Sequence, residues 1–270
     1  MTSDSIDDFL STASTAARLA GDIILQDLGR LSAADVQTKA AFDFVTEVDR
    51  RSEEVIVQTI RDRHPGHRIL TEEGLKEGPG GYRWIIDPLD GTTNYIHGYP
   101  MFSVSIALES DGEIVLGVVF DPFRNEVFSA VRGDGAFLNK RQIHVSGITA
   151  PDRSLVATGF PFRAKGLIDD YLRMFRTVFE EVSDIRRAGS AAIDLAYLAA
   201  GRVEGFFELK LSPWDVAAGS LLVTEAGGIV TDFGGGKGFL STGNIIAGNS
   251  ALQPILLEVA RKVFGGIIEA

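Results

Sequence analysis

The sequence contains no cysteine, and this absence excludes several kinds of chemistry. A chain without thiols forms no disulfide framework, no thiolate metal site and no cysteine nucleophile, and it fits a reducing compartment. Basic residues are scarce relative to acidic ones, with 26 Lys and Arg against 37 Asp and Glu, so the net charge is -11. Because such a chain has little to offer a phosphate backbone, we expect no nucleic-acid partner.

Long apolar runs are also missing. The longest, such as residues 114–120, are interrupted by Gly117 and fall far short of the roughly 20 residues that a bilayer span needs. The segment from Met1 to Asp8 has three acids and no base, so it lacks the features of a secretory signal. We therefore expect a cytoplasmic protein with no membrane partner.

The order of the predicted elements divides the chain in two. Apolar residues at helical spacing predict a long first helix and a second helix that begins after Asp49 and ends before a solvated turn at residues 64–67. Several β-rich runs within residues 84–131 predict a meandering sheet, and strands and helices alternate afterwards. We therefore expect an N-terminal α+β half at residues 1–150 and a C-terminal α/β half at residues 151–270.

The most informative segment is a hydrophobic strand that runs directly into two acids. It reads Trp84-Ile85-Ile86-Asp87-Pro88-Leu89-Asp90-Gly91-Thr92-Thr93-Asn94. Asp87 and Asp90 fit the first and last positions of a β-turn, which can direct both carboxylates into one space. If a short helix begins at Gly91, its amide groups can hold a phosphate oxygen. The competing interpretation is an Asx-type turn in which Asp87 only caps the loop.

Further acids must converge on this segment before metal chemistry is indicated. The candidates are Asp49, Glu72 with Glu73, and Asp215. Each also has a structural interpretation, because Asp49 can be an N-cap and Glu72 and Glu73 can lie in a solvated loop. Asp215 follows Ser212 by three residues, the spacing of a capping box. Taken one at a time, these acids are explained without catalysis.

Taken together, the motifs resemble the inositol monophosphatase family of magnesium-dependent, lithium-sensitive phosphatases. The resemblance covers practically the whole chain, and the matching segments, in family order and spacing, are residues 44–49, 72–73, 87–94, 189–192, 214–219 and 224–228. It implies an α+β fold, a layered αβαβα sandwich of the inositol monophosphatase and fructose-1,6-bisphosphatase type. It also implies a homodimer. Within each chain, the N-terminal half would carry the metal-binding loops and an antiparallel sheet, and the C-terminal half would complete the active site.

The resemblance further implies two to three Mg²⁺ ions in each active site. Glu72, Asp87 and the carbonyl of Leu89 would hold the first ion. The second ion would be held by Asp87, Asp90 and Asp215. A third ion would be bound more weakly, with Glu72 as a ligand. Physical chemistry agrees, because packed carboxylates repel one another unless divalent cations neutralise them.

Catalytic and substrate-binding roles follow from the same resemblance. Asp49 and Thr92 would orient the nucleophilic water, and Glu72 would be the third catalytic residue. No side-chain nucleophile is then required, which agrees with the lack of a Gly-x-Ser-x-Gly elbow. The implied substrate contacts are Asp90, Gly91, Thr92, Ala191, Glu208 and Asp215.

Four basic residues leave two interpretations open. Lys39 corresponds to a mobile-loop lysine of the family, although its spacing to Asp43 varies between members. Lys210 stands in a segment where many relatives carry a glycine. With Arg186 and Arg187, it can favour a substrate with a second anionic group, and the alternative is a solvated or interface side chain.

These inferences predict a Mg²⁺-dependent phosphomonoesterase that hydrolyses a small polyol or sugar phosphate through metal-activated water. Inositol 1-phosphate is the first substrate to test. A fructose-1,6-bisphosphatase or a dual-specificity sugar phosphatase is the alternative, because function follows the pocket rather than the fold. A metal-stabilised protein that regulates a partner is an alternative of another class. The intact pair of Asp49 and Thr92 argues against it, since a scaffold needs no water-orienting pair.

Overall fold

The computed structural model describes residues 5–30, 36–40, 43–72, 74–76, 81–161 and 164–265. The helices are α1 (Ile6–Asp27), α2 (Glu47–Arg63), α3 (Thr92–Ile96), α4 (Ile168–Phe179), α5 (Ala191–Ala199), α6 (Pro213–Glu225), α7 (Phe239–Thr242) and α8 (Leu252–Phe264). Within the described ranges, none of the helices combines the length and the apolar character that a membrane span requires.

The strands belong to three sheets. They are β1 (Val36–Ala40), β2 (Asp43–Thr46), β3 (Arg68–Thr71), β4 (Gly74–Lys76), β5 (Tyr82–Asp90), β6 (Ser103–Ser110), β7 (Glu113–Asp121), β8 (Glu126–Val131), β9 (Gly135–Leu138), β10 (Arg141–Ile143), β11 (Leu155–Thr158), β12 (Asp184–Arg186), β13 (Gly205–Glu208), β14 (Ile229–Thr231) and β15 (Ile245–Gly248). In the described residues, the large sheet has the order β10-β9-β8-β7-β6-β5-β3-β4, the smaller one β12-β11-β13-β15-β14, and β1 pairs with β2. Neighbours from β5 to β10 are antiparallel, which confirms the predicted meander.

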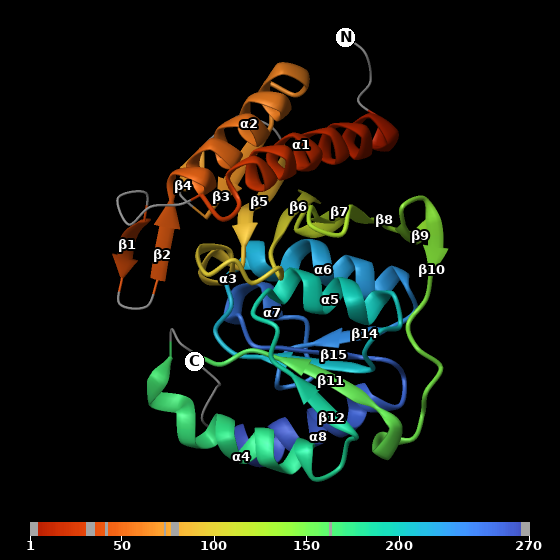
Figure 1. Cartoon of the computed structure of the whole chain (residues 1–270). Helices are drawn as coiled ribbons and strands as arrows, with labels where there is room; N and C mark the ends of the chain where they lie inside the picture. Colours follow the sequence, from red (N-terminus) through yellow and green to blue (C-terminus); the bar gives the residue numbers. More distant parts are fainter. Residues whose placement is uncertain are drawn as a thin grey trace.

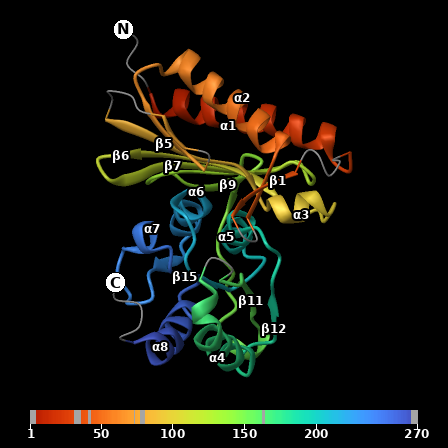
Figure 2. The same ribbon diagram turned by 90° about the vertical axis from the view of Figure 1, so that its left-hand side faces the viewer.

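The layers alternate as αβαβα (Figures 1 and 2). Helices α1 and α2 cover the outer face of the large sheet, α5 and α6 lie between the two sheets, and α4 and α8 cover the outer face of the smaller sheet. Each interface contains a cluster of buried apolar side chains, so burial of apolar surface holds the layers together. The fold class expected from the sequence is confirmed.

Small residues allow the middle helices to approach their neighbours closely. A Cβ atom on Gly117 of β7 would lie 2.8 Å from the carbonyl oxygen of Ala218 in α6. A Cβ atom on Gly219 would lie 2.6 Å from the Cβ of Leu195 in α5. Larger side chains at these glycines would push α6 away from β7 and α5, and α6 carries Asp215 of the candidate site.

The start of α2 differs from the sequence prediction. The helix begins at Glu47 with Thr46 as its N-cap, and Asp49 is the third helical residue rather than the cap. The backbone N–H of Thr46 donates to Asp49 Oδ2 at 2.8 Å, which completes a capping box. Asp49 is therefore fixed by the helix terminus and is fully buried.

The turn after α2 is packed rather than solvated, which corrects our expectation. The rings of His64 and His67 stack with centroids 5.0 Å apart, and the ring of Phe9 in α1 lies 5.0 Å from that of His64. Trp84 Nε1 donates a hydrogen bond to His67 Nδ1 at 3.0 Å. The first helix covers this turn, a contact between distant segments that helical periodicity does not reveal.

We propose that the boundary near residue 150 separates two sheets and not two independently folding domains. One apolar cluster contains Ile85 of the large sheet, Ala218 of α6 and Phe206 of the smaller sheet. A fragment of residues 1–150 would expose the sheet face that α5 and α6 cover. We expect this fragment to lack near-ultraviolet circular dichroism and a cooperative thermal transition, whereas the full chain shows both. Cooperative unfolding of the fragment would contradict this proposal.

Candidate active site

A β-bulge at the end of β5 directs Asp87 and Asp90 to the same side of the sheet. Asp87 pairs with Ser105 of β6 and Asp90 pairs with Ser103, so a three-residue step on β5 matches a two-residue step on β6. Residues three apart in a regular strand point to opposite faces, and the extra residue brings them back to one face. The carboxylates therefore meet through a bulge, and not through the β-turn that the sequence suggested.

Asp215 joins these two acids from the first turn of α6. One carboxylate oxygen from each of Asp87, Asp90 and Asp215 lies within 4.8 Å of the others, and all three residues are buried. The N–H of Ser212 donates to Asp215 Oδ2 at 2.6 Å, so the predicted capping box is also present. A carboxylate has two oxygens with several lone pairs, so capping and membership of the acidic cluster are compatible.

The N-terminus of α5 fixes the Asp90 carboxylate. The hydroxyl of Ser190, the N-cap of α5, donates to Asp90 Oδ2 at 2.6 Å, and the N–H of Ala192 donates to the same oxygen at 2.9 Å. These contacts place a negative group at the positive end of a helix, which is favourable. No contact between Ser190 and Asp90 was predicted from the sequence, although the position of Ser190 before an apolar helix is the usual signal of an N-cap.

Thr92 and Asp49 form the hydrogen-bonded pair that the resemblance implied. Thr92 Oγ1 donates toward Asp49 Oδ1 at 3.0 Å and toward the carbonyl oxygen of Leu89 at 3.1 Å. The hydroxyl of Thr46 donates to the other oxygen of Asp49 at 2.5 Å. Both oxygens of Asp49 are thus engaged, and the orientation of the Thr92 hydroxyl is set by two acceptors.

Two further motif residues hold the loops of the site together. Gly91 has a φ of +94°, and a Cβ atom there would lie 2.8 Å from the carbonyl oxygen of Met101, so glycine is required. The side-chain amide of Asn94 donates to the carbonyl oxygens of Met101 at 2.7 Å and Ala188 at 2.9 Å. Asn94 therefore ties α3 to the loop before α5, a role that the sequence did not show.

The acidic cluster is electrostatically strained. Burial raises the pKa of Asp87 well above its usual value, and the charges of Glu72, Asp90 and Asp215 raise it further. A hydrogen bond from the N–H of Leu89 to Asp87 Oδ1 at 3.0 Å opposes this rise only in part. The cluster is unfavourable in its fully ionised form, so it is a suitable place for a cation.

The same effect extends to a second pair of acids. Burial raises the pKa of Glu208 well above its usual value, with the charges of Asp194 and Asp215 adding to the rise. The pKa of Asp194 is raised for the same reason, first by burial and then by the charge of Asp90. In both cases the positive charge of Arg187 opposes the rise. Asp194, in the first turn of α5, was missed by the sequence analysis.

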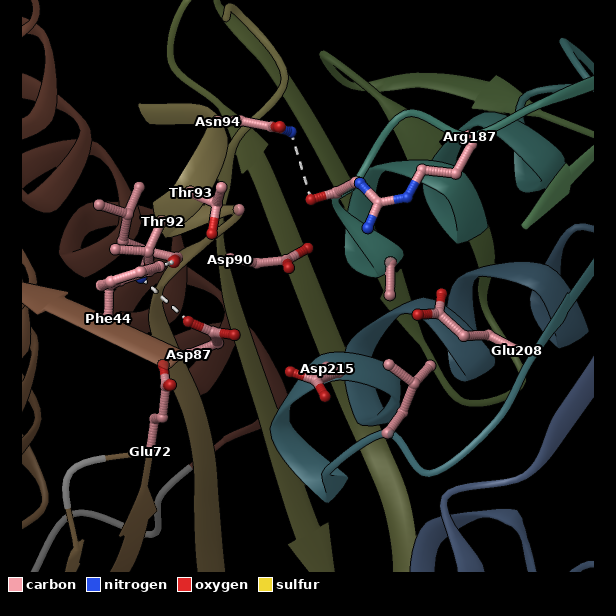
Figure 3. A pocket seen from close by; sticks show the side chains of 15 residues that line it. Phe44, Glu72, Asp87, Asp90, Thr92, Thr93, Asn94, Arg187, Glu208 and Asp215 are labelled. Carbon is pink, nitrogen blue, oxygen red and sulfur yellow. Dashed lines mark hydrogen bonds between the residues drawn. The ribbon is translucent and has the colours of Figure 1, made fainter. Parts of the chain in front are cut away.

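These side chains surround a cavity of about 330 Å³ (Figure 3). Its lining consists of Phe44, Glu72, Asp87, Leu89, Asp90, Gly91, Thr92, Thr93, Asn94, Arg187, Gly189, Ala191, Glu208, Leu211 and Asp215. The structure thus brings together every site residue named from the sequence except Asp49, which is not among the lining residues and contacts the cavity through Thr92. The hard oxygen donors and the small cavity suit a divalent cation and a small phosphorylated molecule.

The four basic residues that the sequence left open differ in their position relative to the cavity. The side chain of Lys39, like Glu73, lies outside the described residues. Lys210 is not among the residues that line the cavity, and Arg186 is an exposed residue paired with Asp184 at 2.5 Å. Arg187 lines the cavity. Of the three described candidates for contact with substrate, the geometry therefore favours Arg187 alone.

Comparisons with known proteins agree with this geometry. The model of the inositol monophosphatase family matches residues 5–264. The protein named Nus factor SuhB from Escherichia coli strain K12 is 50% identical over 254 residues, which cover 93% of this chain and 95% of that protein. Two of the solved structures that resemble this chain illustrate the agreement. The extragenic suppressor protein suhB from Bartonella henselae is 43% identical with a TM-score of 0.91, covering 94% of this chain and 98% of its own. An inositol monophosphatase from Anabaena (Nostoc) sp. PCC 7120 is 39% identical with a TM-score of 0.85, covering 96% and 97%.

Proposed function

This chain belongs to the inositol monophosphatase family, and from that premise we propose that it is a Mg²⁺-dependent phosphomonoesterase for a small polyol or sugar phosphate. Inositol 1-phosphate is the substrate that we propose first. The observation that carries the proposal is the buried cluster of Asp87, Asp90 and Asp215, whose oxygens lie within 4.8 Å of one another on the wall of the cavity. By family resemblance, we also propose that Li⁺ inhibits the enzyme and that it is a cytoplasmic homodimer.

The donor set fits Mg²⁺. The ligands that we propose are the carboxylates of Glu72, Asp87, Asp90 and Asp215 and the carbonyl oxygen of Leu89, for two to three ions. All are hard oxygen donors, and the upward shift of the Asp87 pKa, caused by burial and by the neighbouring carboxylates, supports a neutralising cation in the cluster. When bound, Mg²⁺ would neutralise the phosphate charge, act as a Lewis acid and lower the pKa of a water molecule.

The protein's own residues would then hold the reacting groups. The hydroxyl of Thr92 donates toward Asp49 and Leu89, so its lone pairs can accept a hydrogen bond from a water molecule and orient that water toward phosphorus. The carboxylate of Asp49 is held in position by hydrogen bonds from the N–H and the hydroxyl of Thr46. We propose Glu72 as the remaining catalytic residue, because it lines the cavity beside Asp87.

Substrate contacts follow from the same wall of the cavity. We propose that the N–H groups of Gly91 and Thr92, at the start of α3, hold oxygens of the phosphate. The hydroxyls of the alcohol part would meet Asp90, Glu208, Asp215 and the backbone at Ala191, all of which line the cavity. The buried acids can accept hydrogen bonds from hydroxyl groups, which are neutral, whereas a second phosphate would bring further negative charge next to them.

The relatives' names favour a second candidate function. Proteins 50% identical to this chain are named Nus factor, a name that does not mention a phosphatase. The expectation of no nucleic-acid partner is therefore left without support, and the alternative of a regulatory protein that acts through a partner stays open to test. The intact pair of Thr92 and Asp49 supports the enzyme, because a purely structural module has no need of it.

Phosphate release from a panel of substrates tests the proposed function. We expect Mg²⁺-dependent hydrolysis of inositol 1-phosphate with kcat/KM at least tenfold above that for phenyl phosphate, which has no hydroxyls to meet the buried acids. Preference for fructose 1,6-bisphosphate would instead select the sugar-bisphosphatase alternative. If none of the three compounds is hydrolysed with Mg²⁺ present, the phosphatase proposal is wrong and the regulatory alternative gains.

A further inference from the structure

Arg187 is a pocket residue to which the proposed reaction gives no role. Among the described residues that line the cavity, it is the only basic one, beside five carboxylates. No carboxylate oxygen of the described residues lies within 4.0 Å of its guanidinium, so its charge is not used in an ion pair there. An exposed guanidinium that carries several N–H donors and no ion pair is able to bind a ligand.

Packing holds the guanidinium in place. Its central carbon lies 5.9 Å from the centre of the Phe160 ring, and that ring packs against Tyr171 with centroids 5.3 Å apart. In addition, a Cβ atom at Gly189 would lie 2.5 Å from Arg187 Nη1, so the absence of a side chain at Gly189 makes room for the group. Figure 3 shows the guanidinium projecting into the cavity toward Asp90 and Glu208.

Glu208 lies across a short gap from this guanidinium. Its side chain is 7% exposed, and its carboxylate lies directly against Gly159, where a Cβ atom would overlap it. The positive charge of Arg187 acts on Glu208, although the two groups are not within ion-pair distance. A hydroxyl group can bridge a donor and an acceptor that are too far apart to pair directly, because it accepts one hydrogen bond and donates another.

We propose that Arg187 and Glu208 form a donor and acceptor pair that recognises neighbouring hydroxyls of the substrate, so that Arg187 determines specificity for a polyol phosphate. A hydroxyl can accept from Arg187 and donate to Glu208. Neutral hydroxyls suit the site better than a second phosphate does, because the carboxyl groups of Asp90 and Glu208 line the same cavity as the guanidinium. This inference rests on the proposed function and adds the group that reads the alcohol part.

The variant Arg187→Met tests the inference, because methionine keeps an apolar stem over Phe160 and removes every donor. The measured quantity is kcat/KM for inositol 1-phosphate divided by kcat/KM for phenyl phosphate. We expect this ratio to fall at least tenfold, mainly through a higher KM for inositol 1-phosphate. Arg186→Met is the matched control, since Arg186 is paired with Asp184 and does not line the cavity. The control should keep the ratio within twofold.

In the kinetic comparison, three outcomes would overturn the inference. One is an unchanged ratio in Arg187→Met, and another is an equal fall in the control. The third is a larger fall for fructose 1,6-bisphosphate than for inositol 1-phosphate, which would assign Arg187 to a second phosphate. Calorimetry of inositol 1-phosphate binding, with Ca²⁺ in place of Mg²⁺ to suppress turnover, separates the two proposals. Tenfold weaker binding by Arg187→Met supports this inference even if the wild type hydrolyses nothing, and in that case only the proposed function fails. Equal affinities of the variant and the wild type overturn the inference and leave the proposed function standing.

Discussion

Chelation of divalent metal will reduce hydrolysis of inositol 1-phosphate to background, and millimolar Mg²⁺ will restore it. The reason is the buried group of Asp87, Asp90 and Asp215, whose carboxylates cannot all be ionised next to a phosphate without a neutralising cation. Excess Ca²⁺ should inhibit, because it prefers longer bonds and a looser geometry than the octahedral arrangement of Mg²⁺. Full activity in EDTA, after metal removal is verified by elemental analysis, would contradict the proposed mechanism.

The same experiment has a readout that does not depend on activity. At 100 times its dissociation constant, a ligand that binds only the folded state adds about 2.7 kcal/mol to the free energy of unfolding. For a chain of this size, that corresponds to a rise in Tm of roughly 5–10 °C. Calorimetry with and without Mg²⁺ measures the change, and an unchanged Tm at saturating Mg²⁺ would show that the acids hold no metal.

The sign of the pH dependence also follows from the cluster. Burial, followed by the charges of Glu72, Asp90 and Asp215, raises the pKa of Asp87 in the folded protein above its value of 3.8 in the absence of these effects. Between these two pKa values the folded state binds more protons than the unfolded state. The contribution of Asp87 to stability is therefore lost as pH rises through this window in metal-depleted protein, and saturating Mg²⁺ should reduce that loss.

The second large effect is expected from Asp90→Asn, which should lower kcat/KM by about two to four orders of magnitude with little change in the fold. Ser190 Oγ and the N–H of Ala192 donate to one oxygen of Asp90, and the amide oxygen of Asn can accept both bonds. The variant loses the negative charge that would face the metal. Stabilisation of charge in a transition state is typically worth several kcal/mol, and each 1.4 kcal/mol corresponds to about tenfold in rate.

Asp134→Asn is the matched control for this variant. Asp134 is exposed in the turn between β8 and β9, so the control removes one carboxylate charge away from the cavity. Its kcat/KM should stay within twofold of the wild type. Mg²⁺ titrations and circular dichroism of both variants separate weaker metal binding from misfolding. Activity of Asp90→Asn within threefold of wild type at saturating Mg²⁺ would mean that Asp90 only shapes the end of the strand.

Features that depend on neighbouring residues were predictable from the sequence alone. The first helix is an example, because its buried residues recur at helical spacing from Phe9 to Ile24. The box formed by Ser212 and Asp215 is another, because a cap and its partner lie within one helical turn. The family motif around Asp87 and the meander within residues 84–131 were also readable, and the family and the fold class were correctly identified from the motifs.

Contacts between distant segments were decided only by the tertiary structure. The sequence could not show that a bulge against β6 turns Asp87 and Asp90 to one face, or that Ser190 holds Asp90 across 100 positions of the chain. It also could not separate Arg186 from Arg187, which are adjacent and chemically identical. Only the packing of Phe160 and Gly189 places one guanidinium at the cavity, while its neighbour pairs with Asp184. Hydrogen bonds and packing within one turn of helix constrain residues at fixed spacing, so they leave a pattern in the sequence. Contacts that form only when layers come together impose no such spacing, and the order of residues therefore does not reveal them.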